Sequence, residues 1–131
     1  MIVVDTSALI GVLTGRPHVP RLIDRLSDDS DLHAPHLIDV EFIHALRRLV
    51  VSGDLSADRA EDVRLDFADL SIVRYPHPSL SDRMWELRHN VSAYDAAFVA
   101  LAEALAVPLI TCDARLSRAG GHRANIELFV G

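Results

Sequence analysis

The chain has 131 residues, half of them hydrophobic, and a formal net charge of −6. A chain of this length can bury roughly two thirds of its unfolded surface in one core, so we expect a single domain over residues 1–131. Asp or Arg interrupts every apolar run before it reaches the roughly 18 to 20 residues of a membrane-spanning helix. The opening Met-Ile-Val-Val-Asp does not resemble a signal peptide, and the single Cys112 excludes an internal disulfide. We therefore expect a cytoplasmic protein with no membrane partner.

The acidic charge is unusual for a nucleic-acid binder, which generally presents a basic surface. All 13 basic residues are Arg, and the chain contains no Lys. Arg is the better bidentate ligand for phosphate, so local pairs such as Arg47 and Arg48 can be basic on an acidic chain. Because Arg in place of Lys also follows from a GC-rich genome, composition alone neither supports nor excludes RNA binding.

In the first half of the chain, apolar runs of strand length alternate with longer segments of helical period. The first strand is expected at residues 1–4 and the first helix from Asp5-Thr6-Ser7 to a break at residues 15–20. A short helix at 21–27 and a strand near 32–34 follow. Residues 37–51 predict a helix with apolar residues at helical spacing: Leu37, Val40, Ile43, Leu46, Leu49 and Val50.

The second half continues the alternation. Ser56 is the expected N-cap of a helix that runs to about Leu70, and a strand follows at 72–75. Two further helices are expected at 80–89 and 93–106, then strands at 107–111 and 126–130. Alternation of this kind is typical of a layered α/β fold, so the sequence predicts about five parallel strands with helices on both faces.

Two acidic residues directly follow apolar strands. Asp5 comes after the first strand and Asp113 after the strand at 107–111. In parallel α/β sheets, ligands bind beyond the carboxyl ends of the strands, which makes both residues candidates for a site. Asp also commonly begins a turn or caps a helix after a strand, so either residue alone has an ordinary structural explanation.

Glu41 lies beside the expected buried face of the helix at 37–51. Its neighbours at three and four positions along this helix are Leu37, Ile38, His44 and Ala45. An ionised carboxylate in such surroundings is costly unless it is paired or binds a metal, and Arg48 is two turns away, a long reach for an ion pair. The alternative is that the carboxylate lies at the edge of the apolar face, in water.

Asp95 belongs to the segment Ser92-Ala93-Tyr94-Asp95, which resembles a capping box with Ser92 as N-cap. Phe98 and Val99, three and four positions further on, indicate that this side of the helix faces inward. Each of the four acids has its own ordinary explanation. Four acids in such settings nevertheless favour one shared site over four coincidences.

Close carboxylates raise one another's pKa or bind cations. Oxygen-only ligands favour hard divalent ions, so Mg²⁺ or Mn²⁺ is the expected cofactor. Zinc is disfavoured, because the seven His residues form no HExxH motif and the lone Cys112 has no thiolate partner.

The sequence resembles the PIN-domain nucleases, and within them the VapC-type toxins of bacterial type II toxin–antitoxin modules. The resemblance covers essentially the whole chain. It is carried by MIVVDTSALI at the start, APHLIDVEFIHAL, SAYDAAFVALAEAL, and PLITCDARLSRA near the end.

This resemblance implies a three-layer α/β/α sandwich with a central parallel sheet, and a Mg²⁺- or Mn²⁺-dependent endoribonuclease. It places the four acids in the positions of the family's acidic quartet: Asp5, Glu41, Asp95 and Asp113. By the same resemblance Thr6 or Ser7, and Thr111, are expected to orient carboxylates or water, although Ser and Thr beside Asp are also common turn and cap residues. It further implies a homodimer and a cognate antitoxin, which we expect on the apolar helices between Leu9 and Leu70, with a basic residue inserted toward the acids.

The expected reaction is phosphodiester hydrolysis assisted by one or two metal ions. Asp5 and Asp95 are the first choices as direct ligands. Asp113 is expected to bind directly or through water, and Glu41 to act as a ligand or to accept the proton of water. Expected contacts with RNA, for which a solvated helix face is the alternative, are Arg88, Asn90 and Arg115.

Other α/β classes fit the sequence less well. A receiver domain needs a Lys beside its acids, and the chain has none. A HAD-type phosphatase needs a second Asp two residues after the first, where Ser7 stands, and DTSALIGVL lacks the GxGxxG of a dinucleotide binder. The remaining alternative is a non-catalytic module that binds a metal for structure and acts through protein or RNA binding.

Overall fold

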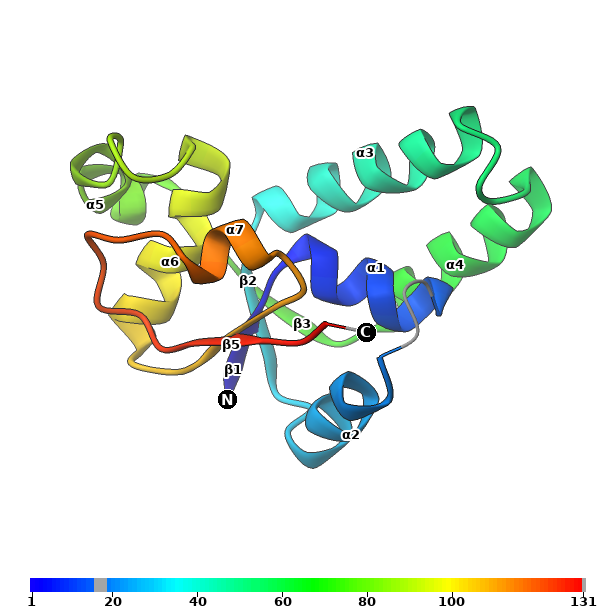
Figure 1. The fold of residues 1–131 in the computed structure, drawn as a ribbon, viewed down its shortest axis with the longest axis horizontal. Helices are drawn as coiled ribbons and strands as arrows, with labels where there is room; N and C mark the ends of the chain where they lie inside the picture. The colour runs from blue at the N-terminus through cyan, green and yellow to red at the C-terminus, as the bar shows by residue number, and fades with distance from the viewer. Residues whose placement is uncertain (16–18, 131) are drawn as a thin grey trace.

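The computed structural model describes residues 1–15 and 19–130 as alternating strands and helices (Figure 1). The strands are β1 (Ile2–Val4), β2 (Leu32–Pro35), β3 (Ile72–Tyr75), β4 (Leu109–Thr111) and β5 (Ile126–Leu128). The longer helices are α1 (Thr6–Thr14), α2 (Pro20–Asp28), α3 (Leu37–Val51), α4 (Ala57–Asp69) and α6 (Ala93–Leu105). The shorter ones are the 3₁₀ turn η1 (Pro78–Leu80), α5 (Ser81–Glu86) and α7 (Ala114–Ser117).

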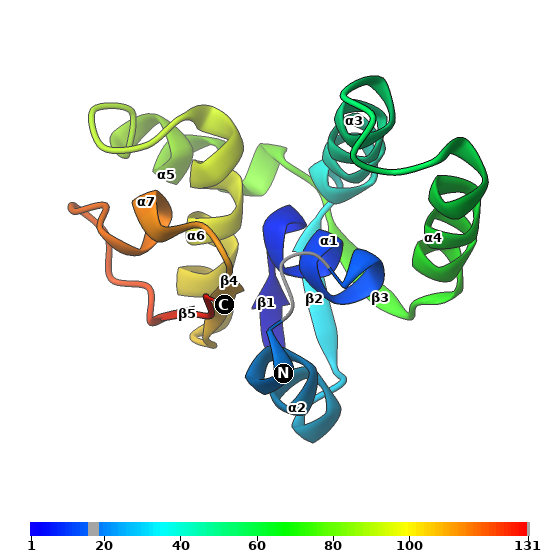
Figure 2. The ribbon, with the colours of Figure 1, turned by 45° about the vertical axis from the view of Figure 1, so that its right-hand side comes forward.

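All five strands are parallel, in the order β3-β2-β1-β4-β5. Helix α6 packs on β1, β2 and β4 with α5 alongside it, whereas α1 packs with α3 and α4. In Figure 2, α5, α6 and α7 lie to the left of β1 and α1, α3 and α4 lie to the right. These two helical layers around the sheet confirm the expected three-layer α/β/α fold with a five-stranded parallel sheet.

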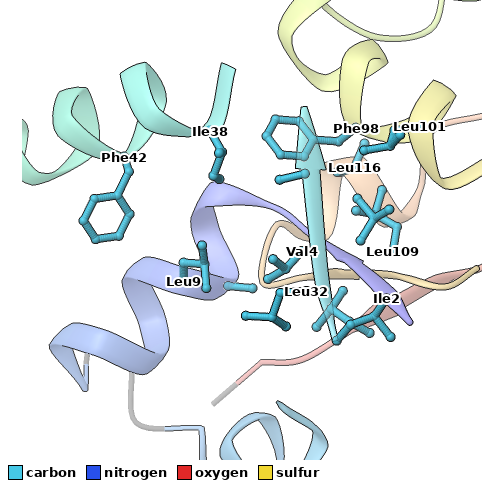
Figure 3. Packing of buried hydrophobic residues seen from close by; sticks show 14 of the residues in the cluster. Ile2, Val4, Leu9, Leu32, Ile38, Phe42, Phe98, Leu101, Leu109 and Leu116 are labelled. Atoms are coloured by element: carbon cyan, nitrogen blue, oxygen red, sulfur yellow. The ribbon is translucent and has the colours of Figure 1, made fainter. Parts of the chain in front are cut away.

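The core lies on both faces of the central strands. Every residue of β1 is fully buried, as is typical of a parallel strand covered on both sides. Figure 3 shows Leu9, Ile38 and Phe42 around one end of this core and Phe98 and Leu101 around the other. Phe42 of α3 stacks on Phe67 of α4 with ring centroids 4.0 Å apart, and this contact packs the two helices against each other.

Local sequence signals explain where several helices begin and end. Ser56 caps α4 as expected, because its hydroxyl accepts a hydrogen bond from the backbone N–H of Arg59. Helix α1 ends at Gly15, which has a left-handed backbone with φ of 71°. The expected break at 15–20 includes residues 16–18, which lie outside the described residues.

The predicted helix at 80–89 is too long. The observed α5 ends at Glu86, and residues up to Asn90 form turns, because the chain must reverse before α6 begins at Ala93. The predicted strand at 107–111 is also shortened, since Pro108 has no N–H for a strand ladder, and β4 begins at Leu109. The short helix α7 was not predicted as a separate element.

The apolar spacing predicted for α3 coincides only in part with its buried face. That face carries Ile38, Phe42 and Leu46, whereas Val40 is 69% exposed and Ile43 is 48% exposed. Helix α3 therefore has a second apolar side that the core does not cover.

None of the described helices is long and apolar enough to cross a membrane.

The topology creates one reversal point in the sheet. From β1 the chain moves to β2 and β3 on one side, and it then returns to place β4 and β5 on the other side of β1. In open parallel sheets, ligands bind at the carboxyl ends of the two strands that flank this reversal. Here those two strands are β1 and β4, which are followed by Asp5 and Asp113.

Candidate active site

Asp5 is a buried carboxylate fixed by three hydrogen bonds. It caps α1 and is 7% exposed. Its Oδ1 accepts from the Ala8 N–H at 3.0 Å and from the Ser7 hydroxyl at 2.8 Å, and its Oδ2 accepts from the Thr111 hydroxyl at 2.5 Å. Burial raises the pKa of Asp5 from 3.8 to about 6, although these hydrogen bonds oppose the shift. Asp5 therefore both caps α1 and places a buried carboxylate at the reversal point of the sheet.

Two hydroxyls link the ends of β1 and β4 around Asp5. The Cys112 N–H donates to Ser7 Oγ at 2.9 Å, and the Asp113 N–H donates to Thr111 Oγ1 at 2.9 Å. The hydroxyl oxygens of Ser7 and Thr111 lie 3.2 Å apart. Ser7 and Thr111 thus orient Asp5 and connect it to the backbone that leads into Asp113.

Glu41 projects from α3 and is half-buried. The Thr6 hydroxyl donates to Glu41 Oε1 at 2.9 Å. Burial raises the pKa of Glu41, the hydrogen bond from Thr6 lowers it, and the nearby charge of Asp95 raises it further. Thr6 and Ser7 therefore orient two different carboxylates, and the buried setting expected for Glu41 is only partial.

Asp95 lies in the first turn of α6, where Ser92 Oγ accepts its backbone N–H at 3.2 Å, as the capping box predicted. Burial raises the pKa of Asp95, the charge of Asp113 raises it further, and Arg115 and the Ser92 hydroxyl lower it. The charge of Asp95 also raises the pKa of Asp5 and of Glu41. Asp95 is therefore the carboxylate that is electrostatically coupled to all three others.

Asp113 caps the short helix α7. Its Oδ1 accepts from the Arg115 N–H at 2.9 Å and lies 3.6 Å from Arg115 Nε. All four carboxylates, together with Thr6 and Ser7, line one pocket of about 240 Å³. The structure thus brings together the four acids predicted from the sequence, from four separate segments of the chain.

The donor chemistry of this pocket fits a hard divalent cation, because its polar lining consists of carboxylate and hydroxyl oxygens. Across residues 1–15 and 19–130, no three His, Cys, Asp or Glu side chains converge closely enough to form a ready-made metal centre. Asp5 is fixed by its hydrogen bonds, so coordination by three carboxylates would need rotation of the side chains of Glu41, Asp95 or Asp113. The pocket therefore contains the oxygen ligands that a cation needs, but the carboxylates are not yet arranged to coordinate it together.

The three residues expected to contact RNA lie in different places. Arg88 lies on the turn after α5, its Nη1 donates to the Trp85 carbonyl, and its guanidinium lies 4.6 Å from the centre of the Trp85 ring. Asn90 and Arg115 instead line a second pocket of about 500 Å³ that shares Asp95 with the first. Its lining also includes Ser92, which the sequence predicted only as an N-cap, and Arg118, which the sequence did not single out. The position of Arg118 three residues after Arg115 was the only available signal.

The family model described as "PIN domain" matches residues 2–122, and the acids at the carboxyl edge of the sheet lie within this match. The chain belongs to the PIN-domain family. Among curated proteins, this PIN domain is 44% identical over 127 residues to "Ribonuclease VapC1" of Mycobacterium tuberculosis, covering 96% of each chain.

Solved structures show the same fold at low sequence identity. VapBC2 from Rickettsia felis, bound to a DNA fragment from its promoter, gives a TM-score of 0.69 at 13% identity, over 99% of this PIN domain and 100% of that chain. VapBC-5 from Mycobacterium tuberculosis, described as a member of the VapBC family of toxin-antitoxin systems, gives 0.56 at 22% identity, over 96% and 94%.

Proposed function

We propose that this PIN domain is an endoribonuclease that hydrolyses RNA phosphodiester bonds with Mg²⁺ or Mn²⁺, and that it is the toxin of a toxin–antitoxin pair. The observation that carries the proposal is the pocket at the reversal point of the sheet, lined by Asp5, Glu41, Asp95 and Asp113. The curated relative that is 44% identical over almost the full chain is itself named a ribonuclease.

The four carboxylates differ in how firmly hydrogen bonds hold them and therefore in the roles we assign to them. When bound, a divalent cation supplies a Lewis acid for the phosphate and lowers the pKa of water. Asp5, held rigidly at the base of the pocket, and Asp95, coupled to the other three, are the residues we assign as its direct ligands. Asp113 completes the oxygen set directly or through water.

Glu41 is the best placed general base. Thr6 occupies its Oε1, and no hydrogen bond to its Oε2 is found among the described residues. Burial raises the pKa of Glu41, and a higher pKa makes a carboxylate a stronger base. We therefore assign to Glu41 the acceptance of a proton from the attacking water, with Thr6 holding the carboxylate in position.

The test is cleavage of a structured RNA by the purified protein, with Mg²⁺ or Mn²⁺ and with a chelator. We expect cleavage only with the cation, and its loss in Asp5→Asn and Asp95→Asn, since Asn keeps the shape of the side chain and removes the charge. Asp24→Asn, on the exposed surface of α2, is the matched control and should cleave normally. Wild-type cleavage by Asp5→Asn and Asp95→Asn at limiting cation would refute the assignment.

The alternative class, a module that binds a metal without catalysis, predicts a different result. The cation would bind and stabilise the fold, but neither structured nor single-stranded RNA would be cut. Cation-dependent cleavage by wild type that is lost in Asp5→Asn excludes this alternative.

The surface we propose for the antitoxin is the groove between α3 and α4. This groove of about 300 Å³ is mainly apolar, and Ile43 and Val51 in it are 48% and 70% exposed. An amphipathic helix can cover such a groove, and the chain after it can carry a basic residue to the carboxylates. The protein encoded by the neighbouring gene should then bind and inhibit cleavage, and failure to do either would remove the toxin–antitoxin part of the proposal. We further propose a homodimer, which a monomeric mass in light scattering would contradict.

A further inference from the structure

The pocket of about 500 Å³ beside the carboxylates has a polar lining drawn from three segments of the chain. Asn90 and Ser92 come from the turn before α6, Asp95 from its first turn, and Arg115 and Arg118 from α7 and its end. Asp95 also lines the carboxylate pocket, so this side chain borders both pockets. A polymer whose scissile bond lies at the carboxylates can therefore reach the second pocket by passing Asp95.

An ion pair holds the segment that follows the lining residue Arg118. Arg83 donates through Nε and Nη2 to the carboxylate of Glu103 at 2.7 and 3.0 Å, and the Glu103 side chain is only 3% exposed. Arg83 Nη2 also donates to the Gly121 carbonyl at 3.2 Å, and Glu103 accepts the Arg123 N–H at 2.6 Å. The segment after Arg118 is thus attached to both α5 and α6.

Asn90 lies close to the same segment. Gly121 has a left-handed backbone with φ of 80°, and a Cβ at this position would lie 2.6 Å from Asn90 Oδ1. Only glycine allows the backbone to approach the Asn90 amide this closely. Asn90, on the turn before α6, therefore lies directly against the segment that follows Arg118.

The charge of this pocket is opposite to that of the carboxylate pocket. Within the part of the chain that the structure describes, Arg118 forms no ion pair with a carboxylate. Arg115 is 86% exposed and lies 3.6 Å from its nearest acid, Asp113. Two exposed guanidinium groups beside four carboxylates suit a phosphate that flanks the scissile one, because Arg binds phosphate in a bidentate manner. A volume of about 500 Å³ is in the range of pockets for small ligands, roughly 300 to 1,000 Å³, and suits one nucleotide.

We propose that this pocket is the subsite for the nucleotide next to the scissile phosphate, and that Arg118, with Arg115, binds the phosphate of that nucleotide. The inference rests on the proposed ribonuclease function and adds to it the path of the RNA strand, which leaves the carboxylates past Asp95. Asn90 faces the same space and is placed to hydrogen-bond the sugar or base.

The first test measures binding of a short, fluorescently labelled single-stranded RNA in the non-cleaving Asp5→Asn background. Replacing Arg118 by Ala should weaken binding about tenfold, which matches the loss of one charge-assisted hydrogen bond. It should also lower the slope of log K against log salt concentration by about 0.7, the contribution of one phosphate contact on a single strand. Arg118→Lys should keep this slope. Arg21→Ala, which removes the same charge from the exposed surface of α2, should leave both quantities unchanged.

The second test identifies the phosphate. Each phosphate of the RNA is replaced in turn by a neutral methylphosphonate. One replacement adjacent to the scissile position should weaken binding of the Asp5→Asn protein at least as much as Arg118→Ala does. The same replacement should have a clearly smaller effect on the Asp5→Asn/Arg118→Ala protein, in which only the Arg115 contact with this phosphate remains. Additive losses at every position would overturn the inference.

The possible failures are distinguishable. If the wild type cleaves RNA while Arg118→Ala and Arg21→Ala behave alike in affinity and salt slope, the subsite is wrong and the proposed function stands. The same conclusion follows if Arg118→Ala weakens only antitoxin binding. If the wild type neither binds nor cleaves RNA with Mg²⁺ or Mn²⁺, both the function and the subsite are wrong.

Discussion

The replacement of Asp5 by Asn should stabilise the metal-free protein. Asp5 is 7% exposed, and burial raises its pKa from 3.8 to about 6, so at pH 7 its ionised form opposes folding. At about 1.36 kcal/mol for each pKa unit, the difference corresponds to about 3 kcal/mol. Asn removes this charge but weakens the hydrogen bond from Thr111, at a cost of about 1 to 2 kcal/mol. We expect a net gain of about 1 to 2 kcal/mol in the free energy of unfolding.

The effect has a defined pH dependence. A folded-state pKa above the unfolded value means that the contribution of Asp5 to stability is fully present below about pH 3.8 and is lost as the pH rises through about 6. In chelator, wild type should therefore lose stability relative to Asp5→Asn between about pH 4 and pH 7. Urea unfolding followed by circular dichroism at several pH values measures this difference. A variant that is less stable than wild type at pH 7, or a difference that does not change with pH, would refute the reasoning.

Three further predictions concern the cation, the Arg83–Glu103 ion pair and the groove. A cation at ten times its dissociation constant should stabilise wild type by about 1.4 kcal/mol, a rise of roughly 3 to 6 °C in Tm, and should affect Asp95→Asn much less; equal shifts at constant ionic strength would leave Asp95 only its capping role. Arg83→Met should cost about 3 kcal/mol in urea unfolding, because the buried Glu103 carboxylate loses its partner, and the cost should shrink as the pH falls below about 4.5 and Glu103 is protonated. A cost that stays constant with pH would contradict that explanation. Ile43→Asp should unfold like wild type but bind the antitoxin at least about tenfold more weakly, and unchanged affinity in a binding assay would exclude the groove between α3 and α4.

The strands and the acids that follow them could be predicted because a parallel strand covered on both faces appears as a short apolar run. Ile2–Val4 and Leu109–Thr111 have this pattern. The acids that follow these strands, Asp5 and Asp113, lie at the reversal point of the sheet. The capping signal at Ser92 was equally local. Local sequence patterns were sufficient to predict those features that depend only on residues close together in the sequence.

The predictions failed where a second contact decides the structure. Periodicity in α3 could not separate the side that faces the core, at Ile38 and Phe42, from the exposed apolar side at Val40 and Ile43, since both repeat at helical spacing. The length of α5 depends on where the chain must reverse to begin α6. Neither feature is visible in a short window of sequence.

The second pocket was beyond sequence reasoning for the same reason. The segment that follows its lining residue Arg118 is held by Arg83, whose contact with Gly121 spans 38 residues, and Gly121 in turn lies close to Asn90. Asn90 and Arg115 were predicted as RNA contacts without any indication that they line one pocket. Arg88, predicted with them, instead lies over Trp85.

The central claim is that the carboxylates form one cation-dependent centre, and a double-mutant cycle on cleavage tests it most directly. Single-turnover rates with Mn²⁺ are measured for wild type, Asp5→Asn, Asp95→Asn and the double variant on one RNA. Residues that act as a unit are strongly non-additive, so the double variant should be about as slow as the slower single variant. If the losses of the two single variants multiply in the double variant, Asp5 and Asp95 act independently and the claim of a single centre is wrong.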